Sequence, residues 1–134
     1  MSAAGAGPVG SRRARVLVVD DDPAITMTFE SILRCEGYEV ATATDGPDAV
    51  RLARYRPFDL ILLDLVMPRM DGLVALRDLR AVAPQARVVI LSAYIEPERE
   101  TEAFRLGAVA VLPKPPDLQK LLEFLHELTE PPAA

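Results

Sequence analysis

Short apolar runs and amphipathic segments alternate along most of the chain. The apolar runs, rich in Val, Ile and Leu and bounded by turn residues, predict β-strands over residues 15–19, 38–43, 59–64, 87–92 and 108–112. Segments with apolar residues at helical spacing follow each run, and they predict helices over residues 23–37, 46–57, 73–84, 96–107 and 117–130. The intervening residues 67–72, MPRMDG, are predicted to form a turn.

Five strands, each followed by a helix, predict an α/β fold with a doubly wound five-stranded parallel sheet, (βα)5. All the strands except residues 38–43 are apolar throughout, which is typical of strands that helices cover on both faces. The leucines of the last helix form one stripe, which predicts a buried face. These leucines are Leu118, Leu121, Leu122, Leu125 and Leu128.

The length of 134 residues predicts a single domain. Residues 1–13 are mostly small, with scattered glycine and proline, and we expect them to form a flexible leader. Residues 14–130 carry the alternating pattern and are predicted to form the domain. Residues 131–134, PPAA, cannot continue a helix, so we expect a short tail there.

The charge balance narrows the classes of function. Lys and Arg number 15 and Asp and Glu 20, so the net charge is 15 − 20 = −5, which argues against direct nucleic-acid binding through the body of the domain. No apolar run reaches the roughly 18 residues that would predict a membrane-spanning helix. The single cysteine, Cys35, cannot form an internal disulfide, and a reducing cytoplasm is the expected location.

Chemically distinctive residues stand at the ends of four predicted strands. Asp20 and Asp21 follow the first strand, Asp64 ends the third, Ser92 ends the fourth, and Lys114 comes just after the fifth. Because the carboxyl ends of parallel strands open on one edge of the sheet, we expect these side chains to lie close together.

Crowded carboxylates need a counter-charge, since two unit charges about 4 Å apart repel by roughly 4 kcal/mol at an effective dielectric near 20. Asp21 and Asp64 can share a hard divalent cation such as Mg²⁺, which prefers oxygen ligands. The cation would also neutralise charge on a phosphoryl oxygen, while Lys114 and Ser92 could bond two more. Asp64 stands alone at its strand end and is the best placed carboxylate nucleophile.

Four motifs together carry a resemblance to a known family: VLVVDDDPAI at 16–25, DLILLDLVMPRMDG at 59–72, VVILSAY at 88–94 and GAVAVLPKP at 107–115. With these motifs and their spacing, residues 14–130 resemble the receiver domain of two-component response regulators. The resemblance implies a flavodoxin-like strand order, 2-1-3-4-5. It also implies that Asp64 is the phosphoacceptor, that Ser92 fills the switch Ser/Thr position and that Lys114 fills the invariant-lysine position.

The resemblance further implies a Mg²⁺ cofactor, which Mn²⁺ could replace. Asp20, Asp21 and Asp64 would hold it together with the backbone carbonyl of Val66, with Asp20 acting largely through water. In this family the bond that corresponds to Lys114–Pro115 is usually cis. Such a domain is a signalling module that catalyses its own phosphorylation and dephosphorylation, and it is not an enzyme with an external substrate.

The implied partners are proteins. A histidine kinase or a phosphotransfer protein would donate the phosphoryl group. A downstream protein target would bind the face that residues 96–107, 108–112 and 117–130 form. The resemblance also allows a phosphorylation-dependent homodimer. No output domain is expected within these residues.

Three positions depart from the family pattern. Val111 stands where the family has a switch aromatic residue, which weakens the expected coupling between Ser92 and the target-binding face. Pro113 and Pro116 flank the Lys–Pro pair and should stiffen that turn. Val66 and Tyr94 would flank the path of the hydrolytic water, and neither suits its positioning, so we expect a long-lived aspartyl phosphate.

Two other functions fit parts of the sequence. A degenerate receiver could serve as a scaffold for protein interaction, because Val111 breaks the switch pair. VVDDDPA also resembles the D-x-D opening of haloacid dehalogenase-type phosphatases, with Asp20 as nucleophile and Asp22 as acid. The hypothesis that the protein is a small Mg²⁺-dependent phosphohydrolase is the weaker one, because Ala24 stands where that family has a Thr or Val. Asp22 is more simply explained as the cap of the first helix.

Overall fold

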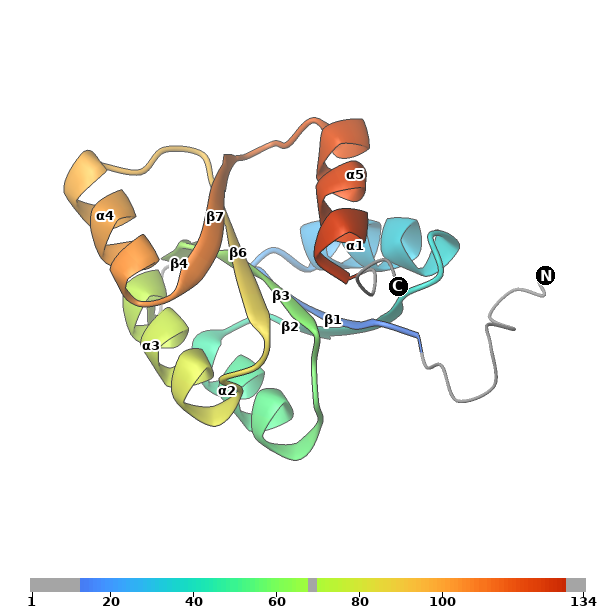
Figure 1. Ribbon diagram of the computed structural model, residues 1–134, viewed down its shortest axis with the longest axis horizontal. Helices are drawn as coiled ribbons and strands as arrows, with labels where there is room; N and C mark the ends of the chain where they lie inside the picture. Colours follow the sequence, from blue (N-terminus) through green and yellow to red (C-terminus); the bar gives the residue numbers. More distant parts are fainter. Residues whose placement is uncertain (1–12, 68–69, 130–134) are drawn as a thin grey trace, which may run out of the picture.

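A computed structural model describes residues 13–67 and 70–129. A five-stranded parallel sheet with strand order β2-β1-β3-β6-β7 forms its centre, and helices lie on both faces (Figure 1). The strands are β1 (Arg15–Val19), β2 (Glu39–Ala43), β3 (Leu60–Asp64), β6 (Arg87–Ser92) and β7 (Ala108–Pro113). Counted along the chain, this is the expected order 2-1-3-4-5, so the predicted fold is confirmed. The predicted leader and tail lie outside the described residues, apart from Arg13.

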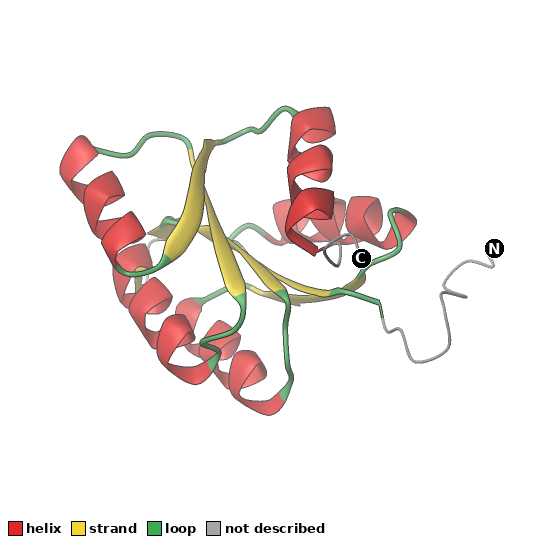
Figure 2. Cartoon of the chain, in the orientation of Figure 1, coloured by secondary structure: helices red, strands yellow, loops and turns green. Residues whose placement is uncertain are grey.

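The five predicted helices are present, within a few residues of their expected ends (Figure 2). They are α1 (Pro23–Cys35), α2 (Gly46–Tyr55), α3 (Gly72–Val82), α4 (Pro97–Arg105) and α5 (Leu118–Thr129). Aspartates cap the first three, because a carboxylate accepts the otherwise unpaired N–H groups of the first turn. Asp22 accepts from the Ala24 N–H at 2.9 Å, as predicted, and Asp45 and Asp71 cap α2 and α3 in the same way.

The sheet separates two apolar cores. On one face, the side chains of α2, α3 and α4 pack against alternate residues of the strands, such as Leu17, Ile61 and Ile90. On the other face, α1 and α5 pack against the residues between them, such as Val18 and Leu62. Burial on both faces explains why these strands are apolar throughout.

The segment after β3 differs from the predicted turn. Residues Val66–Met67 (β4) and Met70–Asp71 (β5) form a short antiparallel pair, and α3 begins directly at Gly72. Gly72 is buried against the backbone of Leu65, and a Cβ at Gly72 would lie 2.6 Å from the Leu65 Cα. The absence of a side chain therefore lets α3 start immediately beside the end of β3, close to Asp64.

The stripe on α5 is buried only in part. Leu121 and Leu125 are buried against the core, whereas Leu118, at the first turn, leaves 42% of its surface exposed. Among the described helices, none combines the length and the hydrophobicity that a membrane span requires.

One buried and one exposed leucine of this stripe provide a matched test of the packing. We expect Leu125→Ala to lower the free energy of unfolding by about 3 kcal/mol, because it removes a fully buried side chain and leaves a cavity. Leu118→Ala should lower it by less than about 1 kcal/mol, because that side chain is exposed. Urea denaturation of both variants measures the difference, and equal losses would contradict the packing of α5 described above.

Candidate functional site

Two buried carboxylates and one lysine meet at the carboxyl edge of the sheet. Asp20 follows β1, Asp64 ends the neighbouring strand β3, and Lys114 follows β7. The Lys114 Nζ donates to Asp20 Oδ2 at 2.6 Å and to Asp64 Oδ2 at 3.0 Å. Only 4% of Asp20 and 6% of Asp64 are exposed, so these contacts are shielded from bulk water. The parallel order of the strands thus joins residues that lie 94 and 50 positions apart.

The second oxygen of each carboxylate is held by the local backbone. The Asp22 N–H donates to Asp20 Oδ1 at 3.0 Å, and the Val66 N–H donates to Asp64 Oδ1 at 3.1 Å. Each donor lies two residues after its aspartate, where the chain leaves the strand. Each carboxylate is therefore fixed between a backbone N–H and the lysine ammonium, which leaves little rotational freedom.

Burial and hydrogen bonding shift the pKa values of Asp64 and Lys114. It raises the pKa of Asp64, and the nearby Asp20 charge adds to the effect, although the bonds from Lys114 and the Val66 N–H oppose it. Burial alone would lower the pKa of Lys114, but the hydrogen bonds to Asp20 and Asp64 outweigh it and raise that pKa. The lysine is thus firmly cationic, while two buried carboxylates share its single charge.

Asp21 adds a third carboxylate on the solvent side. One oxygen from each of Asp20, Asp21 and Asp64 lies within 4.8 Å of the others, with Asp21 exposed and the other two buried. Three hard oxygen donors open to solvent on one side suit Mg²⁺, which keeps several of its waters when proteins bind it. The residues present therefore fit the expected cation. The Val66 carbonyl as a further ligand stays a prediction.

Ser92 lies at the same edge but its hydroxyl bonds elsewhere. It ends β6, beside β3 and β7, and it is buried. Its Oγ donates to the Tyr94 carbonyl at 2.8 Å, while its own carbonyl accepts the Lys114 N–H at 3.0 Å. The hydroxyl therefore holds the loop before α4 in this structure, and the expected contact with a phosphoryl group would require it to turn.

Two features of the site were absent from the sequence interpretation. Lys114, expected to bond a phosphoryl oxygen, bridges Asp20 and Asp64 here. Arg99, in the first turn of α4, donates to Asp71 Oδ1 at 2.9 Å and so ties α4 to the start of α3. The residues of this ion pair are 28 positions apart, and no local pattern marks them as partners.

The Lys114–Pro115 peptide bond is cis, as the resemblance implied.

Comparison with known proteins supports the family that the sequence motifs resemble. Residues 16–126 match the family described as the response regulator receiver domain. Chemotaxis protein CheY of Treponema pallidum is 43% identical over 114 residues, which cover 81% of this chain and 78% of that protein.

Longer proteins and solved structures also match. Transcriptional regulatory protein ZraR of Salmonella typhimurium is 38% identical over 112 residues, which cover 84% of this chain, but the chain spans only 25% of the length of that relative. A crystal structure of a response regulator from Burkholderia pseudomallei, with a phosphorylated aspartic acid, a calcium ion and citrate, superimposes with a TM-score of 0.77. That match has 27% identity and covers 87% of this chain and 73% of the other. With the fold, the acidic cluster and these matches in agreement, the chain belongs to the response regulator receiver domain family.

Proposed function

We propose that Asp64 accepts a phosphoryl group from a histidine kinase or a phosphotransfer protein, and that phosphorylation changes which partner protein this domain binds. The observation that carries the proposal is the buried contact of Asp64 with Lys114 beside the Asp20–Asp21 pair. It supports the proposal because the Asp64 carboxylate, the Lys114 ammonium and the oxygens of Asp20 and Asp21 lie together at one sheet edge. The phosphorylated aspartic acid and the calcium ion named for the Burkholderia response regulator support the same chemistry here.

The residues divide the transfer between them. A carboxylate oxygen of Asp64 attacks phosphorus, the bond from phosphorus to the donor nitrogen breaks, and that nitrogen keeps the electron pair and takes up a proton from solvent. Lys114, which is bonded to Asp64 Oδ2, would pair with a phosphoryl oxygen as the group arrives. Asp20, Asp21 and Asp64 would hold Mg²⁺, which supplies neutralisation of the charge on the phosphoryl oxygens.

Phosphorylation offers the Ser92 hydroxyl a charged acceptor in place of the Tyr94 carbonyl. Charge-assisted hydrogen bonds are roughly twice as strong as neutral ones, so the hydroxyl would leave the carbonyl. The loop that carries Tyr94 leads directly into α4 and would then be released. The signal would thus pass from Asp64 to α4 through Ser92, without the aromatic residue that Val111 replaces.

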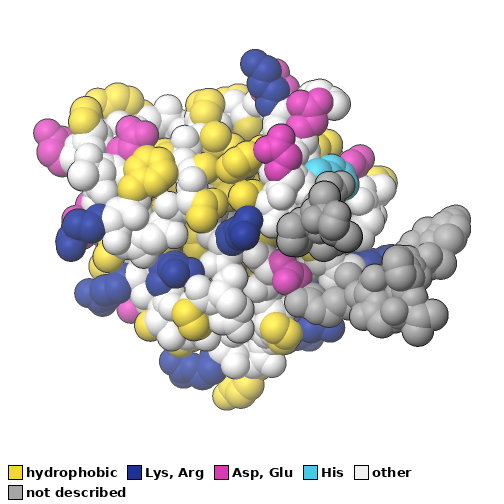
Figure 3. Space-filling view, viewed as in Figure 1, with side chains coloured by type: hydrophobic (Ala, Val, Ile, Leu, Met, Phe, Trp, Pro, Cys, Tyr) yellow, Lys and Arg dark blue, Asp and Glu magenta, His cyan; other side chains and the backbone are white. Residues whose placement is uncertain are grey.

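The face formed by α4, β7 and α5 suits a downstream protein target or a second copy of the domain. Apolar side chains gather over β7 between the two helices (Figure 3). Phe104 and Val109 are exposed there, and together with Val111 and Phe124 they line a groove of about 680 Å³. A surface of this kind lies next to the helix that phosphorylation would release. It suits a partner protein that distinguishes the phosphorylated from the unphosphorylated domain.

The phosphohydrolase alternative fits the site less well. It needs Asp22 as an acid beside Asp20, but the Asp22 side chain accepts from the Ala24 N–H and lies exposed at the start of α1. The scaffold alternative makes no use of the buried Lys114–Asp64 contact. The phosphorylation experiment below separates both from the proposal.

Incubation with acetyl phosphate and Mg²⁺ is expected to add one phosphoryl group, because Lys114 and the bound cation would neutralise the charge that otherwise keeps the phosphoryl group away from Asp64. Intact-mass spectrometry measures the adduct, which should be absent without divalent cation and absent in Asp64→Asn. Asp21→Asn should slow the reaction at least about tenfold, through loss of a charged ligand. Asp22→Asn is the matched control, since it removes the adjacent charge yet asparagine caps a helix equally well. No adduct in the native protein, or the same rate in both Asn variants, would contradict the proposal.

The phosphorylated protein is expected to decay slowly, over many minutes or longer. The side chains of Val66 and Tyr94 are 65% and 72% exposed; Val66 has no hydrogen-bonding group and Tyr94 carries a bulky ring, so neither is suited to orient a water. Val66→Gln, which supplies an amide, should shorten the lifetime several-fold, as release of inorganic phosphate would show. Val109→Gln makes the same change at an exposed position on β7 and should have no effect. A native half-life of seconds would contradict the prediction.

The raised pKa of Asp64 has a consequence for stability. Its ionised form destabilises the fold at every pH above that raised pKa, and the destabilisation is lost as the pH falls through it. Without divalent cations, Asp64→Asn should therefore raise the urea midpoint at pH 7. The gain should vanish near pH 4, about the pKa of an exposed carboxyl group.

Asp71→Asn should act in the opposite direction at pH 7. The hydrogen bond from Arg99 lowers the pKa of Asp71, so its ionised form contributes stability that is lost as the pH falls through that lowered pKa. Asparagine retains the helix cap, so the variant tests the ion pair alone. If both variants shifted the midpoint in the same direction, the charge assignment at the site would be wrong.

A further inference from the structure

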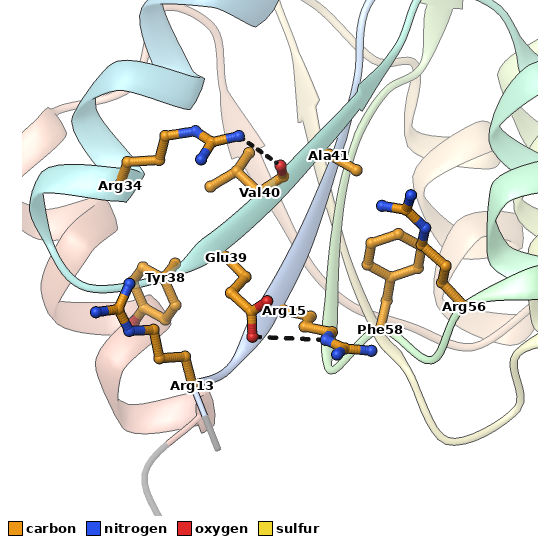
Figure 4. A pocket seen from close by; sticks show the side chains of 9 residues that line it. All are labelled: Arg13, Arg15, Arg34, Tyr38, Glu39, Val40, Ala41, Arg56 and Phe58. Atoms are coloured by element: carbon orange, nitrogen blue, oxygen red, sulfur yellow. Dashed lines mark hydrogen bonds and ion pairs between the residues drawn. The ribbon is translucent and has the colours of Figure 1, made fainter. Parts of the chain in front are cut away.

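A basic groove lies along β2, the edge strand, at its amino end. It encloses about 420 Å³, and the side chains of four arginines line it, Arg13, Arg15, Arg34 and Arg56 (Figure 4). They come from four separate places: the segment before β1, the start of β1, the last turn of α1 and the end of α2. The fold, and no local run of sequence, brings these charges together.

The charge of this groove opposes that of the whole chain. One carboxylate, Glu39, lines it with the four arginines, so the lining carries 4 − 1 = +3. The other residues hold 15 − 4 = 11 basic and 20 − 1 = 19 acidic side chains, a net charge of −8. Such a local concentration of positive charge raises the local concentration of anionic ligands.

The guanidinium groups are held to different degrees. Arg34 is braced, since it donates to Glu30 Oε2 at 2.8 Å and to the Val40 carbonyl at 3.2 Å. Arg15 Nε lies 3.6 Å from Glu39 Oε2, a loose and partly exposed pair. Among the described residues, the side chain of Arg56 has no hydrogen-bond or ion-pair partner. The groove therefore offers one fixed guanidinium, from Arg34, and one unpaired, from Arg56, on opposite sides of β2 (Figure 4).

We propose that this groove binds an acidic, extended peptide segment of a partner protein through carboxylates that pair with Arg56, with Arg15 and with the Nη1 group of Arg34, whose Nε and Nη2 groups already donate to Glu30. Guanidinium groups bind carboxylates through paired hydrogen bonds, which gives direction as well as charge. Arg34 already occupies the outward Val40 carbonyl, so recognition proceeds through side chains and not through addition of a strand to β2. A short acidic segment fits better than a nucleic acid, because the remaining surface, at −8, repels a long polyanion.

The groove is separate from the phosphorylation site. Arg15 begins β1 and Asp20 follows its end, so at about 3.3 Å per residue the two lie roughly 16 Å apart. A peptide in the groove leaves Asp64 and the α4–β7–α5 face accessible. The groove can therefore hold a partner in either phosphorylation state, and the inference does not depend on the proposed function.

Fluorescence anisotropy with the whole chain tests the inference. The probe is a fluorescein-labelled peptide, Ser-Glu-Glu-Ser-Glu-Glu-Ser, and the same peptide with Gln for Glu is its neutral control. At 0.15 M salt the acidic peptide should bind and the neutral one should not. Arg56→Gln should weaken binding about tenfold, which is typical for loss of one charged hydrogen-bonding pair. Asp64→Asn should bind the peptide as tightly as the native protein does.

Arg54→Gln is the matched control. Arg54 lies two residues before Arg56, in the last turn of α2, is exposed and does not line the groove. It removes the same charge, and at this salt concentration its effect should stay within about twofold. Equal weakening by Arg54→Gln and Arg56→Gln would overturn the inference in favour of a general charge effect. Absence of peptide binding, or tighter binding of a single-stranded DNA of equal charge, would also overturn it.

Discussion

The structure depends on one electrostatic constraint: two buried carboxylates, Asp20 and Asp64, share the single charge of Lys114. This arrangement costs stability, because burial raises the pKa of Asp64 and the neighbouring Asp20 raises it further. A fold shaped only by stability would not keep a second buried acid there. The excess negative charge is useful only if another positive group joins it, and this requirement points to both the cation and the phosphoryl chemistry.

Apolar burial elsewhere in the sheet offsets the stability that these buried charges cost. The central strands β1, β3 and β6 are apolar on both faces and are covered by helices, so most of the stabilising burial lies away from the charged edge. The aspartates stand where the strands end, and their remaining oxygens accept backbone N–H groups of the following turns. Gly72 lets α3 start directly beside β3, which brings the Asp71 cap close to the same edge. The strands thus position the charged groups, and the turns that follow them supply the backbone N–H groups that hold these groups.

The charges of the molecule are also segregated between the ends of the strands. The carboxyl ends carry the acidic cluster, while four arginines line the groove at the amino end of β2. Ser92 and Arg99 connect the acidic edge to α4, through the Tyr94 carbonyl and through Asp71. A change at Asp64 would therefore reach α4 first, whereas the basic groove lies at the opposite end of the rigid sheet.

The sequence by itself determined the features that depend on local interactions. Apolar runs and helical spacing specified the five strands and five helices, the aspartate at position 22 specified a cap, and the residue types at the strand ends indicated the phosphoryl chemistry. Tertiary structure alone decided the contacts between distant segments: the Lys114 bridge, the Arg99–Asp71 pair and the arginine groove. The hydrogen bond from the Ser92 hydroxyl to the Tyr94 carbonyl was not predicted either. The β4–β5 pair and the exposure of Leu118 also escaped prediction. Apart from the β4–β5 pair, which is a local backbone pairing, and the local Ser92–Tyr94 hydrogen bond, such contacts depend on how packed elements position side chains that are far apart in the sequence, and the hydrophobic periodicity carries no information on those distances.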